Sequence, residues 1–494
     1  MQKKLTAMAV AGALGSMGSS AVWAQASSVQ IYGTITTSLE YAQAKGADSS
    51  LAPPDGGSSW RNPAGVATGV GGAYSLTPAN RDGRARVQSN GSNFGLRGRE
   101  DLGSGVYAGF QAELGITLGS NSAQASNASG TVATWRNSGV WIGGKAWGEV
   151  GWGMWDTPIT INMALAPAHA AYDNPSTQMQ AGLLGTISAG APGAKVSGYT
   201  VDAQCNPNFV VVAATGTVTL PTLTFGNSAA TCFNWGTSFN RRVSNAFWYQ
   251  SPTWAGFRLR LQYGAPGNQT TASSGAGASG TGGKLSPALY GVGATYTLGG
   301  LYAGFGYEYH KDYLATASRT FGGLVVGGIG TTLTTIPSGA TGVQSSGDWA
   351  WNANLRYTFA FGLTLGGYYE QLKYRLDYNN DFLNPTALKR LDRDAWRLDV
   401  AYQIGPHTFA VQYGQAGDVT CNNVITICNG DGTGTTVWIL GYGYNLSKRT
   451  SLYAYATLVN NDQNAASNGI FFTGITPSPG ADPRYYGFGL RHTF

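Results

Sequence analysis

The last eleven residues of the chain, 484–494, alternate strictly between two kinds of side chain. Successive side chains of a β-strand point to opposite faces, so a period of two predicts a strand with one apolar and one polar face. We expect such a strand, ending on an aromatic residue, to lie in a barrel wall between lipid and water. The apolar or aromatic set is Tyr486, Phe488, Leu490, His492 and Phe494, and the small or polar set is Tyr485, Gly487, Gly489, Arg491 and Thr493.

The first residues of the chain have the pattern of a secretory signal peptide. Lys3 and Lys4 precede an apolar stretch, and Val22-Trp23-Ala24 offers small residues for cleavage. A transmembrane anchor is the alternative, but the stretch is interrupted by several glycine and serine residues. We therefore predict a signal peptide over residues 1–24 and a mature barrel domain over residues 25–494.

The rest of the sequence contains no run of about 20 apolar residues, the length that a spanning helix needs. A membrane protein of this kind must then be a closed β-barrel, because an open sheet edge is not tolerated in hydrocarbon. The composition agrees, with 73 Gly, 27 Tyr and 14 Trp, and only 11% charged residues. A soluble β-sandwich or propeller would also alternate, but aromatic strand ends such as Trp248-Tyr249 and Tyr485-Tyr486 favour interfacial girdles.

Alternating segments recur along the chain and are separated in turn by short turns and long Gly/Ser/Thr/Asn-rich stretches. This order is typical of an outer-membrane barrel with short periplasmic turns and long extracellular loops. We predict an all-β, sixteen-stranded antiparallel transmembrane barrel. The predicted strands are 29–41, 84–99, 105–118, 132–144, 148–155, 241–251, 256–264, 288–298, 301–310, 347–359, 363–375, 394–404, 407–417, 435–446, 450–460 and 484–494.

Charged residues occupy the polar face of several predicted strands. A charge that faced lipid at the middle of the bilayer would cost roughly 2–4 kcal/mol. We therefore expect these side chains to face a lumen, and barrels of 16–18 strands are wide enough for an aqueous channel. The arginines placed inward by alternation are Arg258, Arg260, Arg356, Arg397 and Arg491, and the opposing acids are Glu113, Glu370 and Asp399.

The four cysteines are even in number, as expected of disulfides in an exported protein. The favoured pairs are Cys205–Cys232 and Cys421–Cys428, because each pair falls within one predicted loop. No histidine lies near them, so we expect no zinc, no other metal and no cofactor.

Removing Lys3 and Lys4 leaves 28 Lys+Arg against 24 Asp+Glu, a net charge of +4, which gives no reason to expect nucleic acid as a partner.

Several segments together resemble the general porins of Gram-negative outer membranes, in particular the betaproteobacterial branch. Residues 28–33 resemble the first strand of that family, and residues 92–103 resemble its second strand and turn. Residues 242–263 resemble its sixth and seventh strands, and residues 489–494 are similar to its ending. The resemblance implies a homotrimer of sixteen-stranded barrels in the outer membrane, in contact with its lipid. Each barrel is then a pore for small hydrophilic solutes, and Phe494 is the signal for the outer-membrane assembly machinery.

The resemblance also implies a loop after the fifth strand that folds inward, with acidic side chains facing a basic cluster on the wall. Arg136 matches the arginine of the fourth strand, and Arg242 matches that of the sixth. Asn93 stands where the family usually has arginine, so one charge is missing or is replaced by Arg97, Arg84 or Arg86. With Glu113 and Asp156, these residues are the predicted pore wall.

The loop expected at residues 156–240 departs most from the family, since it exceeds eighty residues and offers only Asp156, Asp173 and Asp202 as acids. It is either an external lobe or a plug or filter folded into or over the pore.

An enzyme is not expected, because none of the four histidines forms a metal-ligand pair or joins a nucleophile motif. We predict a porin for passive diffusion of small solutes and ions with moderate anion preference. The alternatives are a substrate-specific channel gated by the long loop and a plugged structural or adhesin barrel.

Overall fold

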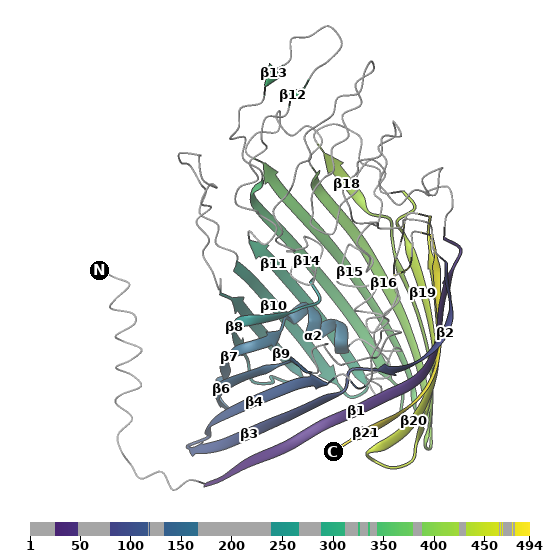
Figure 1. Ribbon diagram of the computed structural model, residues 1–494. Helices are drawn as coiled ribbons and strands as arrows, with labels where there is room; N and C mark the ends of the chain where they lie inside the picture. The colour runs from purple at the N-terminus through teal and green to yellow at the C-terminus, as the bar shows by residue number, and fades with distance from the viewer. Residues whose placement is uncertain are drawn as a thin grey trace.

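The computed structural model describes residues 25–47, 80–116, 133–165, 239–265, 288–311, 343–378, 388–423, 431–463 and 480–494, together with a few isolated positions between them. Within these ranges the chain is a closed antiparallel β-barrel whose strands are tilted to its axis (Figure 1). No helix in the described part of the chain is long and apolar enough to cross a bilayer.

The wall has sixteen strands, as the sequence predicts, and three of them are each divided into two segments. In chain order the wall strands are β1 (Gln25–Lys45), β2 (Arg81–Ser89) with β3 (Asn93–Gly103), β4 (Val106–Ile116), β5 (Ala133–Trp135) with β6 (Ser138–Gly144), β7 (Gly148–Asp156), β8 (Arg242–Gln250), β9 (Phe257–Gly264), β10 (Ala288–Leu298), β11 (Leu301–Lys311), β14 (Val343–Thr358), β15 (Leu363–Tyr378), β16 (Leu388–Ile404), β17 (His407–Ala416) with β18 (Thr420–Asn423), β19 (Thr435–Asn445), β20 (Thr450–Asn461) and β21 (Asp482–Thr493). A separate hairpin joins β12 (Val325–Val326) to β13 (Thr334–Thr335).

The first and last strands close the barrel. β1 pairs with β21 from Thr34 opposite Thr493 to Lys45 opposite Asp482, and its other edge pairs with β2 and β3. The chain end is bonded to the same strand, because Phe494 N donates to Gly33 O at 3.1 Å. The predicted closing role of the C-terminal strand is confirmed.

The two faces of the strands follow the predicted alternation. On β16, Leu398 and Val400 are 54% and 42% exposed on the outside, whereas Arg397 and Asp399 are 0% and 1% exposed on the inside. The same division holds on β21, where Phe488 faces outward and Tyr485 is fully buried inside. The outer surface is therefore apolar and the inner surface polar, as a bilayer requires.

Two predicted details are wrong. The second wall strand is interrupted at residues 90–92, where Gly91 has a φ of 77° that L side chains rarely adopt. That strand also continues through Gly103, beyond its predicted end at residue 99, and the turn is at residues 104–105. Residues 90–92 are Asn, Gly and Ser, and residues 101–105 also include Asp, Gly and Ser. All of these favour turns, so residue type alone does not show where the strand pairing breaks.

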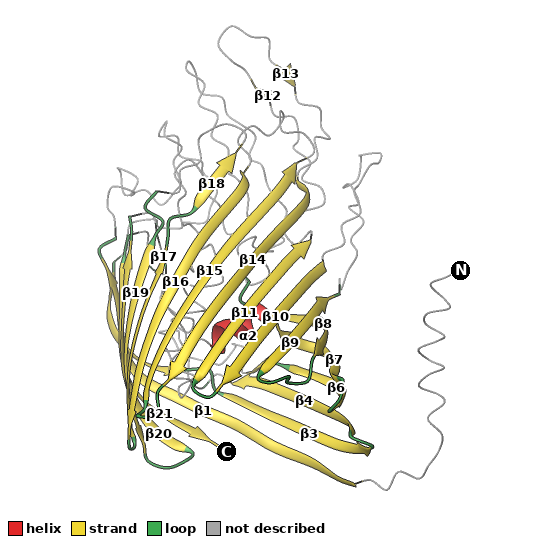
Figure 2. Ribbon diagram, turned by 180° about the vertical axis from the view of Figure 1, so that it is seen from behind, coloured by secondary structure: helices red, strands yellow, loops and turns green. Residues whose placement is uncertain are grey.

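A single helix of the described chain, α2 (Pro158–Leu165), lies inside the barrel (Figures 1 and 2). Thr157 caps it, since its Oγ1 accepts a hydrogen bond from Thr160 N at 3.4 Å, and Pro158 occupies the first helical position. Ile159 and Met163 are buried in one cluster with Ala350 and Leu372 of the wall. The chain after the fifth wall strand, β7, therefore enters the barrel interior.

Candidate functional site

Four glycines on the inner wall make the space that α2 occupies. Two of them lie on β10 and two on the paired strand β11, in each case two residues apart. The inner face of each strand therefore carries no side chain at these positions. A β-carbon at Gly306 would lie 3.1 Å from Ile159 Cα, and one at Gly291 would lie 2.8 Å from Pro158 Cδ. Any larger residue would push the helix toward the pore axis. The four glycines are Gly291, Gly293, Gly304 and Gly306.

Two buried asparagines on β14 hold the helix by its polar groups. Asn352 Nδ2 donates to Ile159 O at 3.1 Å, and Asn162 Nδ2 donates to Asn352 Oδ1 at 2.8 Å. Asn354 Nδ2 donates to Asn162 O at 2.8 Å. Sequence reasoning did not find Asn352 or Asn354, although the Gly-x-Gly spacing of residues 304–306 signals a bare inner face.

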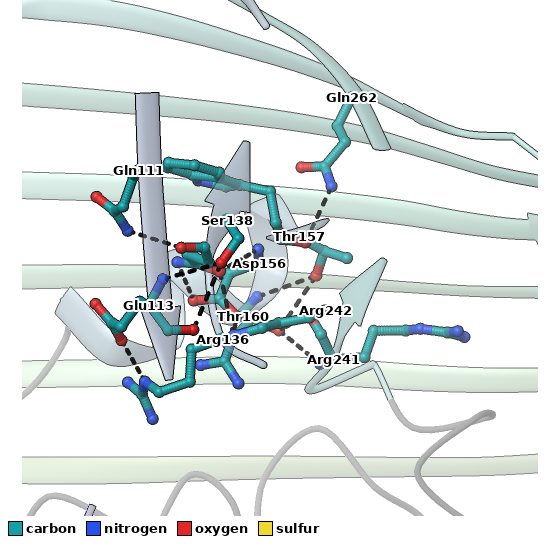
Figure 3. Close-up of polar contacts among 12 residues, drawn as sticks. Gln111, Glu113, Arg136, Ser138, Asp156, Thr157, Thr160, Arg241, Arg242 and Gln262 are labelled. Carbon is teal, nitrogen blue, oxygen red and sulfur yellow. Dashed lines mark hydrogen bonds and ion pairs between the residues drawn. The ribbon is translucent and has the colours of Figure 1, made fainter. Parts of the chain in front are cut away.

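Beside the start of α2, the helix segment is tied to the wall by an ion pair. Arg242 and Asp156 lie side by side (Figure 3), with Arg242 Nε 2.8 Å from Asp156 Oδ1, and Asn137 bridges the two. Asn137 Nδ2 donates to Asp156 Oδ2 at 2.8 Å, and Arg242 Nε donates to Asn137 Oδ1 at 3.1 Å. The side chains of Arg242 and Asp156 are 31% and 17% exposed, so solvent in the lumen reaches both.

A second ion pair continues this row on the neighbouring strands. Arg136 pairs with Glu113 (Figure 3), and Tyr32 donates its hydroxyl to the other carboxylate oxygen of Glu113 at 2.9 Å. Arg97 extends the row, since its guanidinium lies 4.9 Å from the Tyr32 ring and donates to Gln30 Oε1 at 3.0 Å. The structure thus brings together Arg97, Glu113, Arg136, Asp156 and Arg242, which we name the constriction row.

The other predicted wall residues lie elsewhere. Asn93 is buried near the interruption of its strand, with Nδ2 donating to Gly91 O at 3.3 Å. Arg258 is exposed beside a short turn and donates to Thr253. Arg356 lies over Tyr302 on the far wall. Arg397 faces inward, but it is fully buried with Asp399 rather than solvated.

The chain that returns from the long loop is held to the same helix. Thr160 Oγ1 accepts from Arg241 N at 2.8 Å. Phe239 stacks on His310 of β11, with ring centroids 4.4 Å apart. Residues 166–238 between these points lie outside the described residues, as do the predicted signal peptide and the Cys205–Cys232 pair. Cys428 and the side chain of Cys421 also lie outside them, so both disulfides stay predictions.

No group of three or more His, Cys, Asp or Glu side chains with metal-binding geometry occurs among the described residues. The arrangement inside the barrel is instead a row of fixed charges that solvent reaches, beside a helix that narrows the lumen. A closed barrel with an apolar outside, a polar inside and an inward-folded helix defines the class of channel-forming outer-membrane barrels.

The family assignment rests on the sequence itself. The family model described as Gram-negative porin matches residues 5–464, so the chain belongs to the Gram-negative porin family. It is therefore an outer-membrane, multi-pass barrel, and family and fold point to a channel rather than an enzyme. No curated protein matches the sequence.

Two solved structures show the same fold at low sequence identity. An anion-selective porin from Comamonas acidovorans has a TM-score of 0.55 at 20% identity, with 95% of this chain and 100% of that chain covered. The trimer form of OmpT from Vibrio cholerae, folded in vitro, has a TM-score of 0.50 at 14% identity, with 95% and 100% covered.

Proposed function

We propose that the barrel is a water-filled channel for passive diffusion of small hydrophilic solutes and ions, with a moderate preference for anions. The observation that carries this proposal is the constriction row. Arg97, Arg136 and Arg242 stand against Glu113 and Asp156, which leaves one positive charge in excess. Fixed charges in a narrow, partly desolvated passage raise the local concentration of counterions. The preference is moderate because two of the three guanidiniums are paired.

The selectivity of the channel tests this proposal. In a salt gradient across a planar bilayer, we expect the reversal potential of the purified protein to have the sign of anion selectivity. The double variant R136Q/R242Q changes the constriction row from one excess positive charge to one excess negative charge, so its reversal potential is expected to move toward cation selectivity. Arg449→Gln, an exposed residue on the turn before β20, is the matched control and should leave the potential unchanged.

Two results would contradict the proposal. Cation selectivity of the unmodified protein would remove the anion preference, and absence of conductance would favour a closed structural barrel. High salt should reduce the selectivity, because charges exposed to solvent are screened.

We propose in addition that the channel is a homotrimer and that Phe494 is read by the outer-membrane assembly machinery. Family membership supports the trimer, and the related fold of OmpT is known in a trimer form. The ring of Phe494 packs over Gly33 and lies 6.5 Å from Phe94, at the seam between the first and last strands. Native mass measurement of the detergent-extracted protein should give three copies, and a monomeric mass would contradict the trimer.

A further inference from the structure

A row of alternating glycine and tryptophan crosses the inner wall next to the constriction row. The strand register places Gly109 opposite Trp141, Trp141 opposite Gly151, and Gly151 opposite Trp248. A β-carbon at Gly151 would lie 2.2 Å from the Trp248 ring and 2.9 Å from Trp141 Cβ. Each indole therefore lies flat over a neighbouring strand only because that strand carries glycine.

The next row toward the constriction is also made of small residues. Gly139 stands opposite Gly153, and Gly153 stands opposite Ala246. A third indole, that of Trp155, packs here, with its ring centroid 4.6 Å from Trp248 and 6.0 Å from Trp141. We call Trp141, Trp155 and Trp248 the tryptophan platform. Trp248 is buried, whereas Trp141 and Trp155 are only partly buried, so apolar ring surface remains accessible inside the barrel.

Arg260 lies beside the tryptophan platform and has N–H groups that donate to no described group. Its guanidinium carbon is 5.8 Å from the Trp155 ring and 5.6 Å from the Trp248 ring. Its Nη1 donates to Gln250 Oε1 at 3.3 Å, whereas Nε and Nη2 are buried and donate to no described group.

Nearby carboxylates are engaged with other partners. Asp156 pairs with Arg242, and Glu149 accepts from Tyr107 and Gln250 at 3.2 and 3.3 Å. Among the described residues, no carboxylate forms an ion pair with Arg260. Leaving a buried donor without a partner is unfavourable, so an incoming oxygen that accepts from it is stabilised.

Flat apolar faces and a guanidinium with unused N–H groups select a definite ligand chemistry. Aromatic rings stack on indoles, and a carboxylate accepts charge-assisted hydrogen bonds from arginine. We propose that the tryptophan platform and Arg260 form a binding site for solutes that carry a flat ring and a carboxylate. This inference rests on the proposed channel function, and it names a class of solute that the channel retards and selects.

Block of the ion current tests the site. Benzoate carries both groups, acetate carries the charge without the ring, and benzyl alcohol carries the ring without the charge. In chloride solution, single channels should be interrupted by benzoate at concentrations at which neither comparison compound acts. Trp141→Ala and Arg260→Gln should each raise the half-blocking concentration of benzoate by about two- to tenfold, the range that one aromatic or charged contact contributes.

The controls separate this site from the channel itself. Trp152 stands on the same strand as Trp155 but is 47% exposed on the outer face, so Trp152→Ala should leave the benzoate block unchanged. Trp141→Phe keeps a flat ring, so its half-blocking concentration of benzoate should lie between those of Trp141→Ala and the unmodified protein. Current is recorded before benzoate is added, so a variant that forms no channel is recognised. Normal conductance with equal effects of benzoate and acetate would overturn the site while leaving the channel function intact; absence of conductance in the unmodified protein would overturn both.

Discussion

Replacing Arg397 with methionine is expected to lower the free energy of unfolding of the barrel by about 3–5 kcal/mol. Arg397 Nε lies 3.0 Å from Asp399 Oδ2, and both side chains are 0% exposed. Methionine fills a similar volume and preserves the contact with the Tyr368 ring, over which the guanidinium lies at 5.3 Å. The loss therefore comes from a carboxylate that stays buried without its cation. Urea unfolding of the protein in detergent, followed by tryptophan fluorescence, measures it.

The double variant R397M/D399L separates the charge from the packing. It removes both charges, and replacing a whole buried pair with apolar residues is often neutral or stabilising, so most of the lost stability should return. Arg258→Met is the matched control, because Arg258 is exposed and should change stability by no more than about 0.5 kcal/mol. A double variant as unstable as the single variant would show that packing, and not the unpaired carboxylate, is responsible.

The wall of the barrel was predictable because lipid and water lie on its two sides. That difference imposes a period of two on every strand, and the predicted strand 288–298 coincides with β10. The signal weakens where strands leave the hydrocarbon band. β16 begins at Leu388 rather than at 394, and in its first residues Asp392 and Arg393 are adjacent and therefore lie on opposite faces. Alternation cannot identify a strand whose two faces are both polar.

The parts of the site differ in how far the sequence predicts them. The family resemblance places Arg136 and Arg242 on the inner wall, whereas alternation places Arg397 there because a charge that faced lipid would be costly. Alternation gives the face of a strand on which a side chain lies, but it does not say whether water reaches that side chain. Alternation therefore predicts Arg397 in the aqueous lumen, whereas in the structure it is buried beside Asp399. Alternation also does not predict contacts between distant segments: Asn162 and Asn352 are separated by 190 residues and meet only when the loop folds inward.

The docking of α2 is the second feature with a large expected effect. In the variant Asn352→Leu, Ile159 O and the Asn162 side chain lose buried partners, at roughly 1–3 kcal/mol for each group. A shift of 1.4 kcal/mol changes the ratio of docked to undocked helix tenfold. We therefore expect single-channel recordings to show frequent transitions between conductance levels that the unmodified protein visits rarely.

A second variant is expected to undock α2 by steric overlap rather than by loss of a hydrogen-bond partner. Gly306→Val leaves every hydrogen-bond donor in place, but its β-carbon would lie 2.6 Å from Asn352 Oδ1 and 3.1 Å from Ile159 Cα, and this steric overlap displaces the helix. Asn445→Leu, an exposed asparagine near a short turn, is the control for the loss of an amide. If polar anchoring and wall shape together hold α2, then Asn352→Leu and Gly306→Val should produce the same fluctuations, and Asn445→Leu should not. Steady currents in both variants would mean that the helix is held in the lumen by contacts other than those with β11 and β14.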